Sequence, residues 1–278
     1  MTAYPGSAST DDAPPASARR EVPPLFAPPY CAAEDAAVHL RQHGFALLNA
    51  ASVAEWSGAA PEALHVLARS WNDLPPDDYL LDGGKYRHRR HASFEVQGEH
   101  IQPVAHRAHW QPVEYNALHG GIERWFAPMN AATLAQPAWG AVVGALGPLC
   151  DAVFAPGGPA QRWFVEAHQF RIDTASGIGR PTPEGAHRDG VDLVAVFLVE
   201  RGSVKGGETR IFESASPAGQ RFTLAQPWSV LLLDDARMVH ETTPIQPLLA
   251  GDAPAPQDAH RDTLVLTWRR EGFQGPRL

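Results

Sequence analysis

One apolar run dominates the second half of the sequence: Leu193-Val194-Ala195-Val196-Phe197-Leu198-Val199. Its length and its β-branched and aromatic side chains are typical of a buried strand. A glycine-containing turn at Gly202–Gly207 and the alternating segment Glu208–Phe212 follow directly, and this order predicts a β-hairpin. The other runs of strand length in this half are Trp163–Ile172, Trp228–Leu233 and Thr263–Trp268.

The first half of the chain has a helical texture instead. Apolar residues recur at helical spacing over Val53–Trp71, and similar patterns cover Ala32–Gly44 and Trp139–Phe154. Only Phe45–Leu48 is predicted there as a strand. Helices followed by a series of strands are typical of the α+β class, with a β-sandwich or barrel as the core.

The domain organisation follows from length and local composition. Residues 1–29 are rich in Ala, Pro and Ser, and we predict a disordered N-terminal extension because such a stretch buries too little apolar surface to fold. The remaining residues, 30–278, are of a size that all-β barrels and sandwiches reach as one domain. Within it we predict a helix-rich flank at 30–160 and the β-rich core at 161–278.

Composition narrows the class of protein. The hydrophobic share of 44% and the charged share of 19% are globular values, and a net charge of −8 disfavours a nucleic-acid partner. Cys31 and Cys150 are too few for a disulfide framework and fit a reducing compartment. The N-terminus lacks the apolar region of a secretory signal, and no run approaches 18 apolar residues. We therefore expect a cytoplasmic protein without a membrane span.

A candidate metal site lies between two of the predicted strands. His187 and Asp189 are two residues apart, so on an extended segment both side chains leave the same face. His240 follows the predicted strand at 228–233, where the rim of a barrel would be. Two imidazoles and one carboxylate are the ligand set that holds non-haem Fe(II) on one face and leaves the opposite positions open. A hydrolytic Zn(II) site using the same three residues is an alternative.

A family resemblance appears when these residues are taken in order. The motifs are His187-Arg188-Asp189, Gly206-Gly207-Glu208-Thr209, His240 and Arg261-Asp262-Thr263. In this arrangement the chain resembles the Fe(II)/2-oxoglutarate-dependent dioxygenases, and most of all the bacterial branch that hydroxylates free amino acids such as isoleucine or leucine. The resemblance covers about residue 80 to the C-terminus. It implies a double-stranded β-helix (jelly-roll, cupin-like) core from about residue 160 to 270, flanked by N-terminal helices.

The resemblance also implies roles for particular residues. His187, Asp189 and His240 would hold Fe(II), and 2-oxoglutarate would chelate the iron beside the site for O2. The distal carboxylate of 2-oxoglutarate would reach Arg261 and Thr263, which share one strand face. A guanidinium suits this role because it forms two charge-assisted hydrogen bonds to a carboxylate. The loop Pro247–Ala259 separates Arg261 from His240 more widely than is common in the family, so Arg237 and Arg171 are alternatives for this role.

The reaction that the resemblance implies is hydroxylation of a free L-amino acid or a close derivative, with release of succinate and CO2. No catalytic residue beyond the metal centre is expected. Arg87, Tyr115 and Asn116 are the candidate substrate contacts. The basic segment Lys85–His91, which contains Arg87, is equally consistent with a solvated charged surface. Five histidines lie among charged or polar residues, and we expect most of them to be exposed: His88, His91, His100, His106 and His109.

Several alternatives stay open at the level of sequence. A non-catalytic jelly-roll protein that binds a small acid would carry the same strands. Sulfoxidation, desaturation or oxidation of a peptide-linked residue would use the same cofactors. The sequence does not specify the amino acid, the regiochemistry or stereochemistry, the pathway or the oligomeric state.

Overall fold

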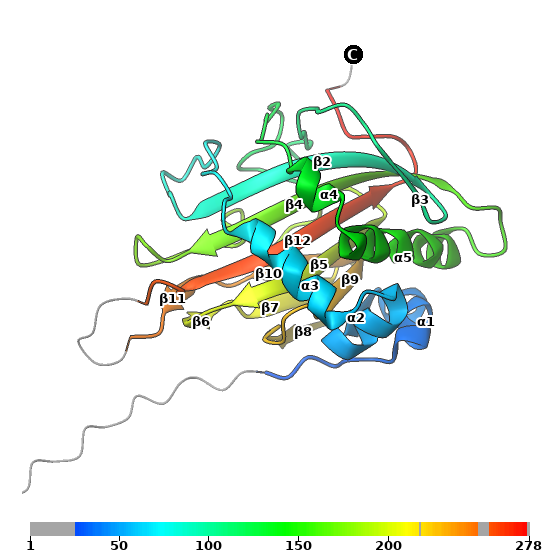
Figure 1. The fold of residues 1–278 in the computed structure, drawn as a ribbon, viewed down its shortest axis with the longest axis horizontal. Coiled ribbons are helices and arrows are strands. Elements are labelled where there is room, and N and C mark those ends of the chain that lie inside the picture. The colour runs from blue at the N-terminus through cyan, green and yellow to red at the C-terminus, as the bar shows by residue number, and fades with distance from the viewer. Residues whose placement is uncertain (1–25, 217, 250–255, 277–278) are drawn as a thin grey trace, which may run out of the picture.

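The computed structural model describes residues 26–216, 218–249 and 256–276. Nearly all of the extension predicted at 1–29 lies outside these residues. The described chain forms a large antiparallel sheet with helices packed on one face and smaller sheets behind the other (Figure 1). In spatial order the large sheet contains β1 (Phe45–Leu48), β9 (Val230–Asp234), β5 (Leu193–Arg201), β12 (His260–Arg269), β4 (Arg162–Asp173), β2 (Arg87–Gln97) and β3 (His100–Pro103).

Two smaller sheets complete the β structure. One contains β10 (Met238–Thr242), β7 (Thr209–Glu213) and β8 (Gly219–Phe222), in that order, and the other pairs β11 (Ile245–Pro247) with β6 (Val204–Gly206). The predicted hairpin between the 193–199 and 208–212 segments is wrong, because β7 pairs with β10 and β8 and not with β5. Both edges of β5 are already paired, with β12 and β9, so the returning chain must join another sheet.

Alternation along the strands divides the interior into two apolar regions. Leu264, Leu266 and Trp268 of β12 point toward the helices. Leu231 and Leu233 of β9 point the other way and pack with Ile211 and Phe222 of the small sheet. Since successive side chains of a strand face opposite sides of a sheet, the large sheet is buried on both faces. Facing antiparallel sheets with helices outside agree with the predicted jelly-roll core and N-terminal helices.

The helices come mainly from the first half of the chain. Their bounds are η1 (Ala33–Asp35), α1 (Ala36–His43), α2 (Ala50–Ser57), α3 (Pro61–Ala68), η2 (Arg69–Trp71), α4 (Ala131–Leu134) and α5 (Pro137–Phe154). The pattern at 53–71 predicted one helix, but the structure has two and a short 3-10 turn. Gly58 ends α2 in a left-handed conformation and Pro61 occupies the first turn of α3, which are common helix-stop and helix-start residues.

The segment 30–160 is not only helical, because it also supplies β2 and β3 to the large sheet. Along β2 the charged residues alternate between buried and partly buried positions, and Arg87, Arg89 and His91 are at most 5% exposed. The expectation of a solvated surface is therefore wrong for these three side chains. His109, which was also expected to be exposed, is buried as well.

Helix α5 is long and apolar enough to cross a membrane by length and composition, with a mean hydropathy of 1.3. In the structure it packs on the large sheet, and Val142, Val143 and Leu146 are fully buried there. Packing in the core accounts for its apolar character.

Candidate metal centre and adjoining cavity

His187, Asp189 and His240 meet at one point between the sheets, with donor atoms within 4.8 Å of one another. The backbones of His187 and His240 form a small antiparallel bridge, with N–H to O=C distances of 3.0 and 2.9 Å. His240 lies on β10, which follows β9 after a short turn. Backbone hydrogen bonds thus bring together His187 and His240, which are about fifty residues apart in the sequence.

Hydrogen bonds orient two of the three side chains. His187 donates Nδ1–H to the carbonyl of Gly185 at 2.9 Å, which leaves its Nε2 free to bind a metal. Gln111 donates its Nε2–H to Oδ1 of Asp189 at 2.9 Å, which leaves Oδ2 free. Partners of this kind fix the ring orientation and carboxylate position of metal ligands in proteins.

Asp235 anchors the segment that carries Asp189. Its buried carboxylate accepts the backbone N–H groups of Asp189, Gly190 and Val191 at 2.7 to 3.1 Å. Gly190 has a φ of +75°, and a Cβ there would lie 2.5 Å from the ring of Tyr115. Burial and the nearby Asp189 raise the pKa of Asp235 to about 7. This anchoring role of Asp235 was not predicted from the sequence.

The pKa shifts of His240 and Asp189 fit a metal site. Burial holds the pKa of His240 well below its usual range, so that imidazole is neutral. Burial raises the pKa of the Asp189 carboxyl, because ionisation inside the protein has little water to stabilise it. A bound cation would supply that stabilisation. His240 Nε2 and Asp189 Oδ2 face one another at 3.8 Å without a hydrogen bond, as two ligands of one ion would.

The three side chains line a cavity of about 120 Å³. Its walls come from the inner faces of β2, β4, β5 and β12, from β10, and from the segment between β3 and α4. The cavity extends along β12, where Arg261, Thr263, Val265 and Thr267 all face it. Such an enclosed space with a few converging polar groups is typical of a small-molecule site.

Arg261 is a buried guanidinium that forms no ion pair with the residues that the structure describes. It is 3% exposed, and its side chain makes no hydrogen bond or ion pair with any described residue. Burial, followed by the nearby Arg201, lowers the pKa of Arg261 to about 10. A buried, unpaired guanidinium is costly, so an anion is expected to bind there.

The two alternatives to Arg261 are engaged elsewhere. Arg171 donates to both carboxylate oxygens of Asp262 at 2.8 and 2.7 Å. Arg237 donates to the backbone carbonyls of Leu40, Arg41 and Gln42 at the end of α1. Neither lines the cavity, so among the three candidates the structure favours Arg261.

The three candidate substrate contacts are divided by the structure. Arg87 and Asn116 line the cavity, and Arg87 also donates to the buried Asp77 at 2.7 Å. Tyr115 does not line it, because its ring lies outside, with the guanidinium of Arg188 5.6 Å from the ring centre.

Several cavity residues were not found from the sequence. Gln111 accepts hydrogen bonds from Asn116 at 3.1 Å and Arg124 at 2.9 Å, and so joins both to Asp189. Gln111 and Arg124, which were missed, lie between β3 and α4, in a segment with little regular structure and therefore no periodic pattern of apolar residues. Glu184 could have been predicted as a cavity residue, because it lies only three residues before His187 in the sequence. In the structure its Oε1 lies 3.5 Å from His187 Nε2.

Comparison with known proteins agrees with this site. A family model described as 2OG-Fe dioxygenase matches residues 68–267. The crystal structure of a bsmA homolog from Methylobium petroleophilum PM1 is 51% identical, with a TM-score of 0.81, over 89% of this chain and 97% of that one. No curated protein matches the sequence significantly.

More distant structures share the fold. IDO from Bacillus thuringiensis is 16% identical with a TM-score of 0.66, over 86% of this chain and 100% of that one. The Fe(II)/(alpha)ketoglutarate-dependent dioxygenase TqaL is 18% identical with a TM-score of 0.63, over 86% of this chain and 87% of that one.

The family match favours an oxygenase over a zinc hydrolase or a non-catalytic binding protein. The family match spans the donor set and Arg261, and it implies Fe(II), 2-oxoglutarate and O2 as cofactor and cosubstrates. The chain belongs to the 2OG-Fe dioxygenase family.

Proposed function

We propose that this dioxygenase hydroxylates a free L-amino acid or a close derivative while 2-oxoglutarate is converted to succinate and CO2. The observation that carries the proposal is the pairing of fixed positive and negative charges around one small cavity beside the candidate metal centre. The resemblance of the sequence to the amino-acid hydroxylases supports the same substrate class.

In this proposal His187, Asp189 and His240 hold the Fe(II). The His187 imidazole is oriented by its hydrogen bond to Gly185 and the Asp189 carboxylate by Gln111, while the backbone bridge between His187 and His240 holds the two histidines side by side. Bound iron, together with 2-oxoglutarate and O2, supplies the oxidising power for attack on a C–H bond. The protein places that bond next to the metal and keeps bulk water away from it.

Arg261 and Thr263 would bind the distal carboxylate of 2-oxoglutarate. Both face the cavity from β12, and the buried guanidinium of Arg261 has no other anion among the described residues. Ile172 and Val265 contribute apolar surface at this end of the cavity, which excludes water and strengthens the ionic interaction.

The substrate would be held by charges of both signs. Burial and the neighbouring Arg87 lower the pKa of Arg124 to about 10, as expected for a guanidinium short of negative charge. Arg87 and Arg124 would bind the substrate carboxylate. Glu184, whose buried Oε2 has no hydrogen-bond partner in the described part of the chain, would accept hydrogen bonds from the substrate ammonium group.

The test is a panel of free amino acids assayed for stimulation of succinate release by the Fe(II)-loaded protein. The proposal predicts at least one amino acid that raises the rate well above the substrate-free rate and is itself oxidised. The N-acetylated form of that amino acid should stimulate far less, because it lacks the ammonium group. A panel without any stimulating amino acid, or equal stimulation by the acetylated form, would contradict the proposal.

A further inference from the structure

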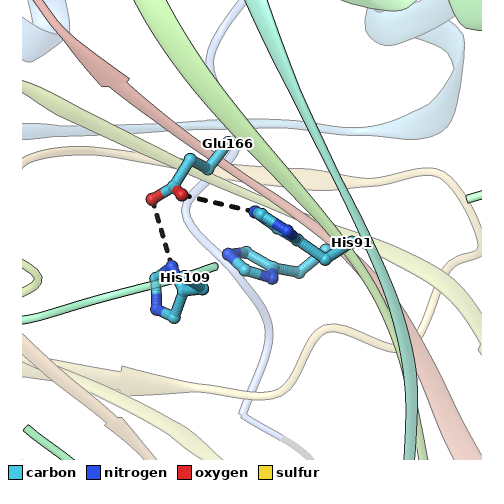
Figure 2. Close-up of side chains that lie close together, drawn as sticks. His91, His109 and Glu166 are labelled. Atoms are coloured by element: carbon cyan, nitrogen blue, oxygen red, sulfur yellow. Dashed lines mark hydrogen bonds and ion pairs between the residues drawn. The ribbon is translucent and has the colours of Figure 1, made fainter. Parts of the chain in front are cut away.

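A buried cluster of polar side chains lies next to the substrate end of the cavity. His91 comes from β2, Glu166 and His168 from β4, and His109 from the segment after β3, and all are at most 6% exposed. Figure 2 shows Glu166 between His91 and His109, with Oε2 3.1 Å from His109 Nδ1 and Oε1 3.3 Å from His91 Nε2. Arg107 donates to Oε1 of Glu166 at 2.8 Å.

These contacts fix which nitrogen of His109 carries the proton. His109 and His91 hold the pKa of Glu166 well below its usual range despite burial, so the carboxylate is ionised and can only accept hydrogen bonds. Burial lowers the pKa of His109 to about 4, so its ring is neutral near pH 7. The single N–H of His109 must therefore be on Nδ1, facing Glu166, and Nε2 must be an acceptor.

His168 has the opposite arrangement. Arg89 lies with Nη2 2.6 Å from Nδ1 of His168, and a guanidinium can only donate. Burial and the charge of Arg89 hold the pKa of His168 well below its usual range, so this ring is neutral too. Its Nδ1 accepts from Arg89, and its N–H must be on Nε2.

The two imidazoles thus offer complementary hydrogen-bonding atoms at one place. Both rings line the cavity, their centres are 4.7 Å apart, and neither Nε2 has a partner among the described residues. His109 Nε2 accepts a hydrogen bond and His168 Nε2–H donates one. A hydroxyl or a carboxamide can do both in return, whereas a hydrocarbon can do neither.

The distribution of apolar side chains points the same way. Ile172, Val196 and Val265 line the cavity from the strands around Arg261, whereas Phe170 stacks on His168 with the ring centres 5.6 Å apart. The wall formed by His109, Gln111, Asn116, His119 and Arg124 is polar. An aliphatic substrate side chain placed against that wall would leave the polar atoms of the wall without hydrogen-bond partners, which is unfavourable in a buried site.

We propose that His109 and His168 bind a hydroxyl or carboxamide group on the substrate side chain, with Glu166 as the positioning residue that fixes the His109 tautomer. The proposal rests on the proposed function, and it specifies the substrate as an amino acid with a hydrogen-bonding side chain.

A metal ion is the competing occupant of this cluster, since His91, His109, Glu166 and His168 would each offer a ligand atom. Two observations disfavour it. Arg89 already uses the lone pair on Nδ1 of His168, and the contacts of Arg89 and Arg107 leave more positive than negative charge around the group. A neutral polar group suits that environment better than a dication.

The first experiment compares amino acids of similar shape that differ in hydrogen-bonding capacity. Threonine is tested against valine, asparagine against leucine, and glutamine against methionine, each for substrate-stimulated succinate release. A site built to bind a polar group rejects an analogue without it far more strongly than an apolar pocket distinguishes sizes, so we expect kcat/KM to favour the polar member by about 100-fold or more. The threonine–valine pair tests whether the site binds a hydroxyl group, and the other two pairs test whether it binds a carboxamide. A preference for the aliphatic members would overturn the inference.

Two substitutions at His109 then separate its two nitrogens. His109→Asn keeps an N–H near Nδ1 for Glu166 and removes the acceptor at Nε2, while His109→Gln keeps a polar group near Nε2. We expect His109→Asn to reduce the polar preference to about tenfold or less and His109→Gln to retain more of it. His100→Asn, at an exposed position of β3, is the control and should leave the preference unchanged. Equal preference in His109→Asn and the wild type would contradict the role of His109.

Spectroscopy and metal analysis make the test independent of catalysis. Long-range ¹H–¹⁵N correlation spectra of the histidine rings should show His109 protonated on Nδ1 and His168 on Nε2, and Glu166→Gln should alter the His109 pattern. The reverse tautomers would overturn the inference even if turnover is observed. A second metal equivalent that survives in Asp189→Ala and is lost in Glu166→Gln would overturn it too. If no amino acid supports turnover, the proposed function fails while the tautomer assignment is still tested by these spectra.

Discussion

The two ends of the cavity differ in how the chain builds them. The proposed metal and 2-oxoglutarate end is made from strand positions and a strand-like bridge, with the backbones of His187 and His240 hydrogen-bonded and with Arg261 and Thr263 both on β12. The substrate end is made from β2 and the irregular segment between β3 and α4, which supplies His109, Gln111 and Arg124. Strand spacing brings side chains to one face in a regular way, so the first end can be identified from motifs and the second cannot.

The largest effect is expected at the metal end. Replacing Asp189 with alanine removes the only carboxylate among the three donor groups, and we expect succinate production to fall to background while the fold is retained. Succinate release and circular dichroism check both parts. Asp73→Ala, at an exposed position, is the control. Turnover that persists in Asp189→Ala would remove this residue from the metal site.

The next effect concerns the anchor for 2-oxoglutarate. Arg261→Ala should raise the 2-oxoglutarate concentration needed for half-maximal rate by about 100-fold, because a buried charge-assisted pair is worth about 3 kcal/mol. Titration of 2-oxoglutarate at saturating Fe(II) measures it. Arg171→Ala and Arg237→Ala serve as comparisons, since both guanidinium groups are bonded outside the cavity. A larger shift in either of them than in Arg261→Ala would reassign the anchor.

Gln111 connects the two ends, because it bonds Asp189 on one side and Arg124 and Asn116 on the other. Gln111→Leu should weaken Fe(II) binding by about 10-fold to 100-fold, the usual range for partners that orient a metal ligand. Equilibrium titration with Fe(II) under anaerobic conditions measures the affinity. An unchanged affinity would show that Asp189 is held by Asp235 and the backbone alone.

The buried, neutral state of His109 should make the free energy of unfolding depend on pH. The pKa of His109 is about 4 in the folded protein and 6.5 as its ordinary value. As the pH falls below 6.5 the unfolded chain binds a proton that the folded protein takes up only near pH 4, so the free energy of unfolding decreases, by at most about 3 kcal/mol. Urea unfolding at pH 7 and pH 5 should show a smaller loss for His109→Asn than for the wild type. Identical losses would mean that His109 is not neutral and buried as described.

The smallest effect is expected for Tyr115, which the sequence suggested as a substrate contact. Its ring lies outside the cavity against Arg188, so Tyr115→Phe should change KM for the amino acid by less than about twofold. Steady-state kinetics with the best substrate of the panel will measure this. A tenfold rise in KM would return Tyr115 to the site.

Sequence patterns predicted most of the strands, and the three residues predicted as metal ligands lie together in the structure, for physical reasons that the structure makes clear. Continuous apolar runs such as Leu193–Val199 can only be satisfied in a sheet that is covered on both faces, and that is where β5 lies. The partner of β7 could not be predicted, because strand pairing depends on which edges are free after the rest of the sheet has formed. Asp235 and Gln111 were missed because their roles come from hydrogen bonds between segments that are distant in sequence.

The basic segment shows a different kind of error. Lys85–His91 looks solvated when its charges are counted, but alternate residues of β2 point inward, and Asp77 pairs with Arg87 there. Burial of several arginines is tolerable only because a buried acid and aromatic rings accompany them, and Arg89 lies 3.5 Å from the ring centre of Phe126. Those partners come from other parts of the chain and cannot be recognised from the segment itself.

We propose that His187, Asp189 and His240 bind ferrous iron with an open face that accepts 2-oxoglutarate. The most direct measurement is anaerobic addition of Fe(II) and 2-oxoglutarate to the wild-type protein and to Asp189→Ala, followed by visible absorption. The account predicts a weak charge-transfer band in the wild type that requires both additions, saturates at one iron per chain and is absent in Asp189→Ala. No band in the wild type, or the same band in Asp189→Ala, would contradict it.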